Sequence, residues 1–216
     1  MKLFIDSANL DEIKKAVSWG IVDGATTNPT LIARDGGDFR KTVMEICRIV
    51  GGPVSAEIMS EEANAMVNEA RMVADWHKNI VIKIPCTFEG LKAAKALNKL
   101  GVKTNVTLVF SPNQVLAAAK AKATYISLFV GRLDDCGEDG LGAIKTVLQI
   151  INNYGFASQL IVASVRSPLT VEKAAALGAP IATVPFKIIE QMVKHPLTDT
   201  GIKMFSEDWA KYKSGQ

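Results

Sequence analysis

Residues 80–85 read IVIKIP, a short apolar run that a single lysine, Lys83, interrupts. β-Branched residues in an unbroken apolar run are typical of a parallel strand that is buried on both faces. Seven further short apolar runs occur along the chain, and longer segments with helical periodicity separate them. The eight predicted strands are 3–5, 24–27, 54–58, 80–84, 102–106, 125–130, 160–163 and 181–184.

Helix starts and stops can be read between these strands. Ser111 and Ser167 each stand before a proline, and a serine cap followed by proline at the first helical position predicts a helix start. Gly101 follows an apolar-periodic segment and predicts a helix end. The short glycine clusters at 36–37 and 51–52 predict loops. One apolar stripe predicts a helix that covers the sheet, and it consists of Ala63, Met66, Val67, Ala70 and Val73.

The alternation of strand and helix predicts an α/β fold in which right-handed crossovers join parallel strands. Eight such units favour closure into a (β/α)8 TIM barrel, and an open doubly wound sheet is the alternative. A chain of 216 residues with 48% hydrophobic composition can bury a large core. We therefore expect a single barrel domain over residues 1–216.

Two helical segments follow the last predicted strand, at about 186–194 and 199–211. The final segment carries more apolar side chains than a free tail needs, among them Phe205 and Trp209. We expect this extra C-terminal helix to pack either on the barrel or on a neighbouring subunit.

The composition argues against several classes of function. The net charge is +3, from 25 Lys and Arg against 22 Asp and Glu, which is too small and too scattered to predict a nucleic-acid partner. Cys47, Cys86 and Cys136 have no CxxC spacing, so they predict neither a disulfide framework nor a metal site. The first residues contain no apolar segment long enough for a signal peptide or membrane span. We expect a cytoplasmic protein with no membrane partner.

Lys83 is the most informative single residue, because it lies near the C-terminal end of an apolar strand. Burial disfavours the charged ammonium and increases the fraction of neutral amine that can attack a carbonyl. A lysine that extends from the strand end to solvent is the alternative.

Polar or ionisable side chains end most of the other predicted strands. In a barrel these ends surround one mouth, where active sites of this architecture occur. Each residue alone has a simpler interpretation as a cap or turn, as for Asn28 before Pro29, but the complete ring favours a site. The ring consists of Asp6, Thr26, Thr27, Asn28, Glu57, Thr107, Ser127, Arg132, Ser164 and Arg166.

Arg132 and Arg166 form a candidate phosphate site together with Ser164, because planar guanidinium groups bind phosphate through paired hydrogen bonds. Surface ion pairing is the alternative for both arginines. The sequence contains no Walker or Rossmann phosphate loop, no GxSxG motif and no metal-ligand spacing.

Six motifs, in order along the chain, carry a resemblance to a known family. They are FIDSAN (4–9), TTNPTL (26–31), IVIKIP (80–85), TNVTLVFSPNQ (104–114), FVGRLDD (129–135) and ASVRSP (163–168). The chain resembles the transaldolase family, and in particular its short subfamily, which is related to the fructose-6-phosphate aldolases. The resemblance implies a class I, Schiff-base enzyme that needs no metal or organic cofactor.

The resemblance also implies catalytic roles for four residues. Lys83 is similar to the Schiff-base lysine, which attacks the C2 carbonyl of a ketose. Asp6 is similar to the acid/base that removes the C4 hydroxyl proton. Glu57 and Thr107 resemble the pair that holds a catalytic water during formation and hydrolysis of the imine.

Further residues resemble the family's substrate contacts. The groups that hydrogen-bond the dihydroxyacetone unit are, by this resemblance, Thr27, Asn28 and Ser127. The phosphate clamp is, in the same way, Arg132, Ser164 and Arg166. Phe129 stands where fructose-6-phosphate aldolases resemble one another in having tyrosine, and phenylalanine cannot donate a hydrogen bond to water. In the family's logic this apolar ring protects the enamine from water, and Glu57 in place of glutamine points the same way.

The resemblance therefore implies transfer of dihydroxyacetone from fructose 6-phosphate or sedoheptulose 7-phosphate to an aldose phosphate, in the pentose phosphate pathway. A fructose-6-phosphate aldolase that releases free dihydroxyacetone is the nearer alternative. A noncatalytic sugar-phosphate-binding barrel is the other, but it gives Lys83 no reason to lie in an apolar strand. Because the short relatives form rings, the resemblance suggests a homopentamer or a homodecamer.

Overall fold

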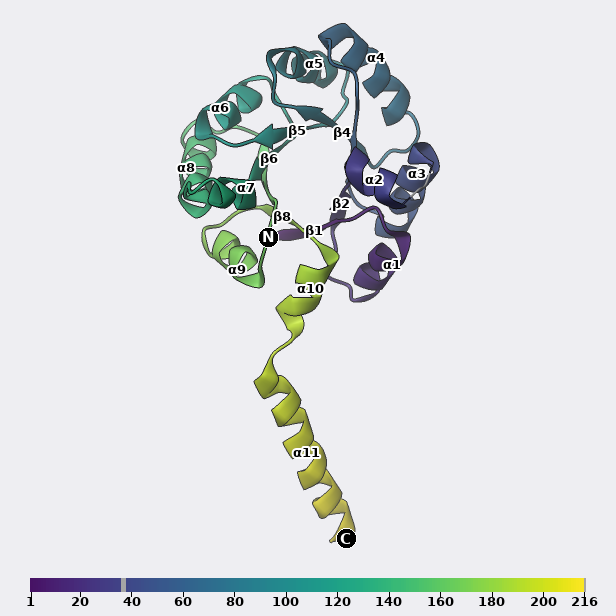
Figure 1. Ribbon diagram of the computed structural model, residues 1–216, viewed down its shortest axis with the longest axis vertical. Coiled ribbons are helices and arrows are strands. Elements are labelled where there is room, and N and C mark those ends of the chain that lie inside the picture. The colour runs from purple at the N-terminus through teal and green to yellow at the C-terminus, as the bar shows by residue number, and fades with distance from the viewer. Residues whose placement is uncertain (36–37, 216) are drawn as a thin grey trace.

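Eight parallel strands close into a barrel in the computed structural model, which describes residues 1–35 and 38–215 (Figure 1). Each strand pairs with the next strand along the chain, and β8 returns to pair with β1. The predicted barrel is confirmed, and the open doubly wound sheet is excluded. The strands are β1 (Lys2–Asp6), β2 (Gly24–Thr26), β3 (Val54–Glu57), β4 (Ile80–Pro85), β5 (Thr104–Val109), β6 (Tyr125–Phe129), β7 (Gln159–Ala163) and β8 (Ile181–Val184).

Helices surround this barrel and bury their apolar faces against the outer side of the strands (Figure 1). The first nine are α1 (Leu10–Ser18), α2 (Pro29–Asp35), α3 (Phe39–Val50), α4 (Ala63–Ala74), α5 (Phe88–Lys99), α6 (Pro112–Lys120), α7 (Val130–Asp135), α8 (Gly140–Asn153) and α9 (Pro168–Ala176). The caps predicted at Ser111 and Ser167 are confirmed, since each hydroxyl accepts a backbone N–H in the first turn of its helix. The glycine pair 36–37 lies outside the described residues.

A second, smaller apolar cluster fills the inside of the barrel. It consists of Phe4, Val81, Tyr125, Ile161 and Ile181, which come from five different strands. The Phe4 and Tyr125 rings meet edge to face, with centroids 6.3 Å apart. Gly24 makes room for this cluster, because a Cβ there would lie 2.5 Å from the Phe4 ring. The cluster closes the barrel beneath the strand ends.

Seven of the eight predicted strands agree with the structure to within one residue at either end. The prediction of 102–106 for the fifth strand is wrong, because β5 begins at Thr104 and runs to Val109. The N–H of Val102 instead bonds to the carbonyl of Leu97 and completes the end of α5, where Gly101 has a φ of 74°. This is a Schellman stop, so Val102 belongs to the helix end.

The last two helices are α10 (Phe186–Val193) and α11 (Pro196–Ser214). Helix α10 lies against the barrel and buries Ile189, whereas α11 has no buried residue and extends away from the barrel (Figure 1). Of the two alternatives for the final helix, packing on the barrel is therefore excluded, and packing on a neighbouring subunit stays a prediction. Within residues 1–35 and 38–215, no helix has both the length and the apolar character needed to cross a membrane.

Candidate active site

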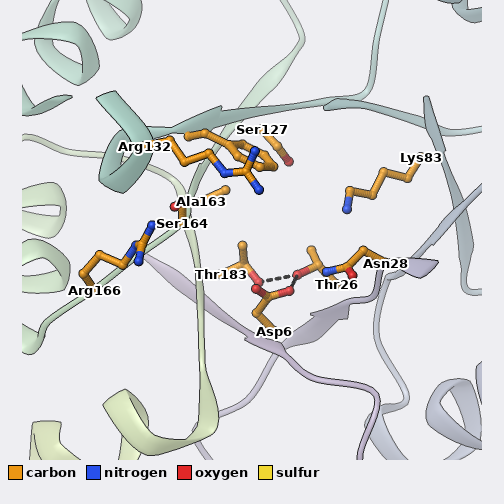
Figure 2. Close-up of a pocket in the computed structure, with 11 residues that line it drawn as sticks. Asp6, Thr26, Asn28, Lys83, Ser127, Arg132, Ala163, Ser164, Arg166 and Thr183 are labelled. Atoms are coloured by element: carbon orange, nitrogen blue, oxygen red, sulfur yellow. Dashed lines mark hydrogen bonds between the residues drawn. The ribbon is translucent and has the colours of Figure 1, made fainter. Parts of the chain in front are cut away.

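The site residues form the layer directly above the apolar cluster inside the barrel. Side chains two positions apart on a strand point the same way, so each inward residue of the cluster is followed by an inward residue nearer the strand's C-terminal end. Asp6 follows Phe4 in this way, and Thr26 follows Gly24. The same step leads to Lys83, Ser127, Ala163 and Thr183. The six residues of this upper layer, from Asp6 to Thr183, line one cavity of about 190 Å³ at the mouth (Figure 2).

Lys83 points into this cavity and is only 6% exposed, so it does not extend to bulk solvent. Its Nζ lies 3.0 Å from Oε2 of Glu57 and donates to the carbonyl oxygen of Thr27 at 3.1 Å. Glu57 is placed by the register, since Glu57 and Lys83 pair across β3 and β4. The amine is thus held by one carboxylate and one carbonyl, with the cavity in front of it.

Asp6 faces the same cavity from β1 (Figure 2). Its Oδ1 accepts a hydrogen bond from the Thr26 hydroxyl at 2.8 Å, and that hydroxyl lies 2.6 Å from the hydroxyl of Thr183. Burial raises the pKa of the Asp6 carboxyl above its usual value, and the Thr26 hydrogen bond and the charge of Lys83 oppose this rise. A carboxyl with a raised pKa both accepts and returns protons near neutral pH more readily than an exposed one.

A buried polar network supports the other side of the cavity. Asn105 on β5 is fully buried; its Nδ2 donates to Ser55 Oγ at 3.1 Å, and its Oδ1 accepts from the Ser127 hydroxyl at 2.8 Å. Because the single Ser127 hydrogen is used in this way, the serine offers its lone pairs to the cavity. Asn105 was not among the predicted site residues. Its signal in the sequence is an amide inside a buried strand, next to Thr104 and Val106.

Of the predicted residues Thr27, Thr107 and Asn28, only Asn28 lines the cavity. Thr27 does not line it, because the Thr27 hydroxyl bonds to the Ser55 carbonyl and only the Thr27 carbonyl reaches Lys83. Thr107 is fully buried beside β4, and its hydroxyl has no hydrogen-bond partner among the described residues. Asn28 lines the cavity and also caps α2, since its Oδ1 accepts the Leu31 N–H at 2.9 Å. The amide NH₂ of Asn28 is the group left for a ligand.

Two arginines stand on the rim, in α7 and in the turn after β7 (Figure 2). Arg132 places its guanidinium carbon 5.6 Å from the Phe129 ring centroid. Arg166 Nη2 lies 2.7 Å from Oδ2 of Asp135, and both side chains are more than half exposed. The surface ion pair considered as an alternative for the arginines is thus present for Arg166. An exposed pair of this kind is worth about 0–1 kcal/mol, so an incoming anion can replace the carboxylate.

The turn that carries Ser164 and Arg166 packs closely on α7. A Cβ at Gly131 would lie 2.0 Å from the Ser164 carbonyl oxygen and 2.9 Å from Arg166 Nε. Ser164 has a φ of 59°, which is costly for a residue other than glycine. Gly131 therefore allows the two arginine-bearing segments to lie next to each other, as a shared anion site requires.

Phe129 closes one side of the cavity at the end of β6. The Phe110 ring meets it edge to face, with centroids 5.6 Å apart. Phe129 thus gives this side of the cavity an apolar ring, and Phe110 packs against that ring without lining the cavity itself. Within the described residues, no group of His, Cys, Asp and Glu is arranged to hold a metal ion. The groups placed here for chemistry are an amine, two carboxylates and two arginines at the rim.

Comparison with known proteins agrees with this arrangement. The model of the family described as "Transaldolase/Fructose-6-phosphate aldolase" matches residues 3–215. A protein of Caldicellulosiruptor saccharolyticus named "Probable transaldolase" is 59% identical over 212 residues, which cover 98% of each chain. Proteins with the same name from Thermoanaerobacter sp. and Clostridium tetani are 58% and 55% identical, and each match covers 97–98% of both chains. The chain belongs to the transaldolase/fructose-6-phosphate aldolase family.

Proposed function

We propose that the protein is a transaldolase that carries a dihydroxyacetone unit on Lys83 as a Schiff base. The observation that supports this most directly is the buried amine itself, which lies 3.0 Å from Glu57 Oε2 and faces the cavity that Asp6 also lines. A binding protein for sugar phosphates would use the arginine rim, but it would gain nothing from a lysine desolvated at the bottom of its cavity.

The first step is attack of the neutral Lys83 amine on C2 of a ketose phosphate. Glu57 lies 3.0 Å from Nζ, so it can take the ammonium proton and leave the electron pair that forms the C–N bond. The carbinolamine then loses water to give the iminium. We assign to Glu57 and Thr107 the water that carries these protons, because the buried Thr107 hydroxyl has hydrogen-bonding capacity that no described residue uses.

Asp6 then removes the proton from the C4 hydroxyl. The C3–C4 bond breaks, its electron pair moves to the iminium nitrogen, and the shortened aldose leaves while an enamine remains on Lys83. The raised pKa of Asp6 suits this step, because a buried carboxylate is a stronger base than an exposed one. Asn28 and Ser127 hold the hydroxyl groups of the three-carbon unit.

The enamine next attacks the aldehyde carbon of an acceptor. Asp6 returns its proton to the new alkoxide, and hydrolysis of the resulting iminium releases the new ketose phosphate and regenerates Lys83. Protons and electrons balance over this cycle without an oxidant, a metal or an organic cofactor. We expect fructose 6-phosphate or sedoheptulose 7-phosphate as donor and an aldose phosphate such as glyceraldehyde 3-phosphate or erythrose 4-phosphate as acceptor, as in the pentose phosphate pathway.

The phosphate group of each sugar is assigned to Arg132, Ser164 and Arg166. Arg132 lines the cavity without a carboxylate partner among the described residues, whereas Arg166 must exchange Asp135 for the phosphate. Phosphate binds two guanidinium groups through several charge-assisted hydrogen bonds, and these outweigh one exposed ion pair.

The apolar ring of Phe129 favours transfer over hydrolytic release. An enamine is lost when a proton reaches its carbon, and the Phe129 ring, which lines the cavity, has no proton to donate. The competing function is an aldolase that releases free dihydroxyacetone. The two are separated by measuring cleavage of fructose 6-phosphate with and without erythrose 4-phosphate. A transaldolase turns over repeatedly only when the acceptor is present, whereas rapid turnover without it would select the aldolase.

Covalent trapping tests the lysine directly. Borohydride reduction in the presence of fructose 6-phosphate should attach one three-carbon unit per chain, and peptide mass spectrometry should locate it on Lys83. Lys83→Arg keeps the charge but cannot condense with a ketone, so we expect no trapping and at least a 10³-fold loss of kcat, the scale of losing a covalent nucleophile. The exposed helix residue Lys95 provides the matched control, and Lys95→Arg should behave as the wild type. Normal turnover by Lys83→Arg would refute the mechanism.

We further propose that the chain assembles with copies of itself into a homopentamer, or into a homodecamer of two such rings. The support is α11, which exposes Ile202, Phe205 and Trp209 and has no buried residue.

A further inference from the structure

Thr183 lines the active cavity from β8, but the reaction described above gives it no part. It is 3% exposed and lies on the strand that pairs with β1, which carries Asp6. Its hydroxyl lies 2.6 Å from the Thr26 hydroxyl, which in turn lies 2.8 Å from Asp6 Oδ1. In Figure 2 these three groups lie together on one side of the cavity.

The direction of this hydrogen-bonded chain follows from counting protons. A hydroxyl has one hydrogen, and an ionised carboxylate only accepts. When Asp6 is ionised, Thr26 must donate its hydrogen to Oδ1, as its geometry indicates. Thr26 can then only accept from Thr183, so Thr183 is the donor in the 2.6 Å contact.

We infer that Thr183 is a positioning residue for Asp6, which acts through Thr26 to fix the carboxylate and keep it ready to accept the substrate proton. The inference rests on the role of Asp6 in the proposed function. Because Thr26 engages Oδ1, the atom left to receive the proton is Oδ2, which has no hydrogen bond among the described residues.

Thr183 can influence the pKa of Asp6 through Thr26, although it does not contact Asp6 in this hydrogen-bonded chain. Burial raises the pKa of Asp6, and the hydrogen bond from Thr26 is the first influence that opposes this rise. A donor that itself accepts a hydrogen bond is more polarised and donates more strongly. Loss of the Thr183 hydroxyl should therefore weaken the Thr26 bond and raise the pKa of Asp6 further.

The test is Thr183→Val, which removes the hydroxyl and keeps the β-branched shape that the strand accommodates. We expect kcat to fall about tenfold, the usual scale for one buried hydrogen bond, with little change in KM. Because Asp6 must be ionised to act as a base, the acid limb of the kcat–pH profile should also move to higher pH. Thr183→Ser keeps the hydroxyl and should restore both the rate and the profile.

A matched control lies in the same barrel. Thr104 on β5 is buried, does not line the cavity, and has a hydroxyl without a partner among the described residues. Thr104→Val therefore removes a buried threonine hydroxyl with no link to Asp6, and it should leave kcat and its pH profile unchanged. Circular dichroism shows whether each variant folds, and Thr183→Ala repeats the test if the valine variant does not.

Two further measurements separate failure of this inference from failure of the proposed function. Formation of the imine does not require Asp6, so borohydride trapping of dihydroxyacetone on Lys83 should proceed in Thr183→Val as in the wild type. Asp6→Asn reports on Asp6 itself: if it turns over normally, the proposed role of Asp6 is wrong. If Asp6→Asn is inactive while Thr183→Val keeps the wild-type rate and pH profile, only the positioning role is overturned. A slow valine variant with an unshifted profile, or one that serine does not rescue, would also overturn it.

Discussion

Asp6, which we propose as the acid/base of the reaction, is a side chain whose burial lowers the stability of the fold. The carboxyl is enclosed by β1, β2 and β8, and burial raises its pKa despite the Thr26 hydrogen bond and the nearby Lys83. A raised pKa means that the folded state favours the protonated form. The ionised form that we assign to catalysis therefore has a cost in stability.

We predict that Asp6→Asn makes the protein more stable at neutral pH while it abolishes turnover. For an acid whose pKa is raised in the folded state, the stability is fully present at low pH and is lost as pH rises through the folded-state pKa. Asparagine never ionises, so it escapes this loss and can still accept the Thr26 hydrogen bond through its Oδ1. The difference in Tm between variant and wild type should therefore be larger at pH 8 than at acid pH.

Calorimetry at several pH values checks this prediction, with about 2–4 °C expected for each 1 kcal/mol in a domain of this size. Asp11→Asn is a control of equal charge change, because Asp11 is exposed in the first turn of α1, where a carboxylate is favourable. Asp11→Asn should not raise the stability of the protein. A Tm difference for Asp6→Asn that shrinks as pH rises would contradict the argument.

At the scale of the element, six helices of the barrel end in the same way, with a residue in the left-handed conformation two positions beyond the helix. After five helices the second residue beyond the end is a glycine with positive φ, whose N–H bonds to a carbonyl in the last turn; these residues are Gly20, Gly101, Gly137, Gly155 and Gly178. Helix α6 ends in the same hydrogen bonds, but the residue in this position is Lys122, with a φ of 66°. A residue with a Cβ is strained in that conformation.

We predict that Lys122→Gly stabilises the protein by about 0.5–1 kcal/mol, the left-handed strain relieved less the extra chain entropy of glycine. Lys122 is exposed, so its side chain gives up little packing. Thermal or urea unfolding should show the gain with unchanged kcat. Gly178→Lys is the reciprocal control, because a Cβ there meets no atom within 4 Å and only the φ of 85° opposes it. It should destabilise by a similar amount, and equal stability of both variants would show that φ is not the cause.

The elements also show what the sequence can and cannot predict. Apolar runs separated by helical segments predict the eight strands and the barrel, because parallel strands buried on both faces need such runs. The same double burial removes the alternation that would reveal which residues face inward. Thr27 was predicted to bind substrate, but its neighbour Thr26 faces the cavity, and the inward Asn105 and Thr183 were not predicted to belong to the site.

Residues at strand ends were easier to predict. Lys83, Asp6 and Ser127 line one cavity, and Arg132 and Arg166 line its rim, because barrel closure brings the C-terminal ends of all strands together. Surface ion pairing was an alternative for Arg166, but its partner Asp135 could not be predicted, since the pair depends on how α7 and the turn after β7 pack on each other through Gly131.

At the scale of the whole molecule, the barrel is closed on itself while α11 stands apart from it (Figure 1). Ile202, Phe205 and Trp209 are 60%, 75% and 59% exposed, and their spacing places them on one side of the helix. Tyr212 continues this stripe and stacks on Trp209 with ring centroids 5.5 Å apart. A helix with such a stripe gains most of its stability from packing, so we assign the stripe to an interface with a second copy of the chain.

We predict that Phe205→Glu dissociates the assembly, because an unpaired carboxylate would have to be buried where an aromatic ring packs. Thr200→Glu introduces the same charge at an exposed position of the same helix, about 140° around the axis from Phe205 and away from the stripe. It should leave the assembly intact. Sedimentation velocity distinguishes the outcomes: the wild type and Thr200→Glu should sediment as a pentamer or decamer, and Phe205→Glu as smaller species. The free energy of unfolding of the barrel should change little, since α11 buries nothing against it.

A wild-type chain that sediments as a monomer at micromolar concentration would contradict the proposed assembly altogether. Equal dissociation by both glutamates would instead assign the effect to charge rather than to the apolar stripe.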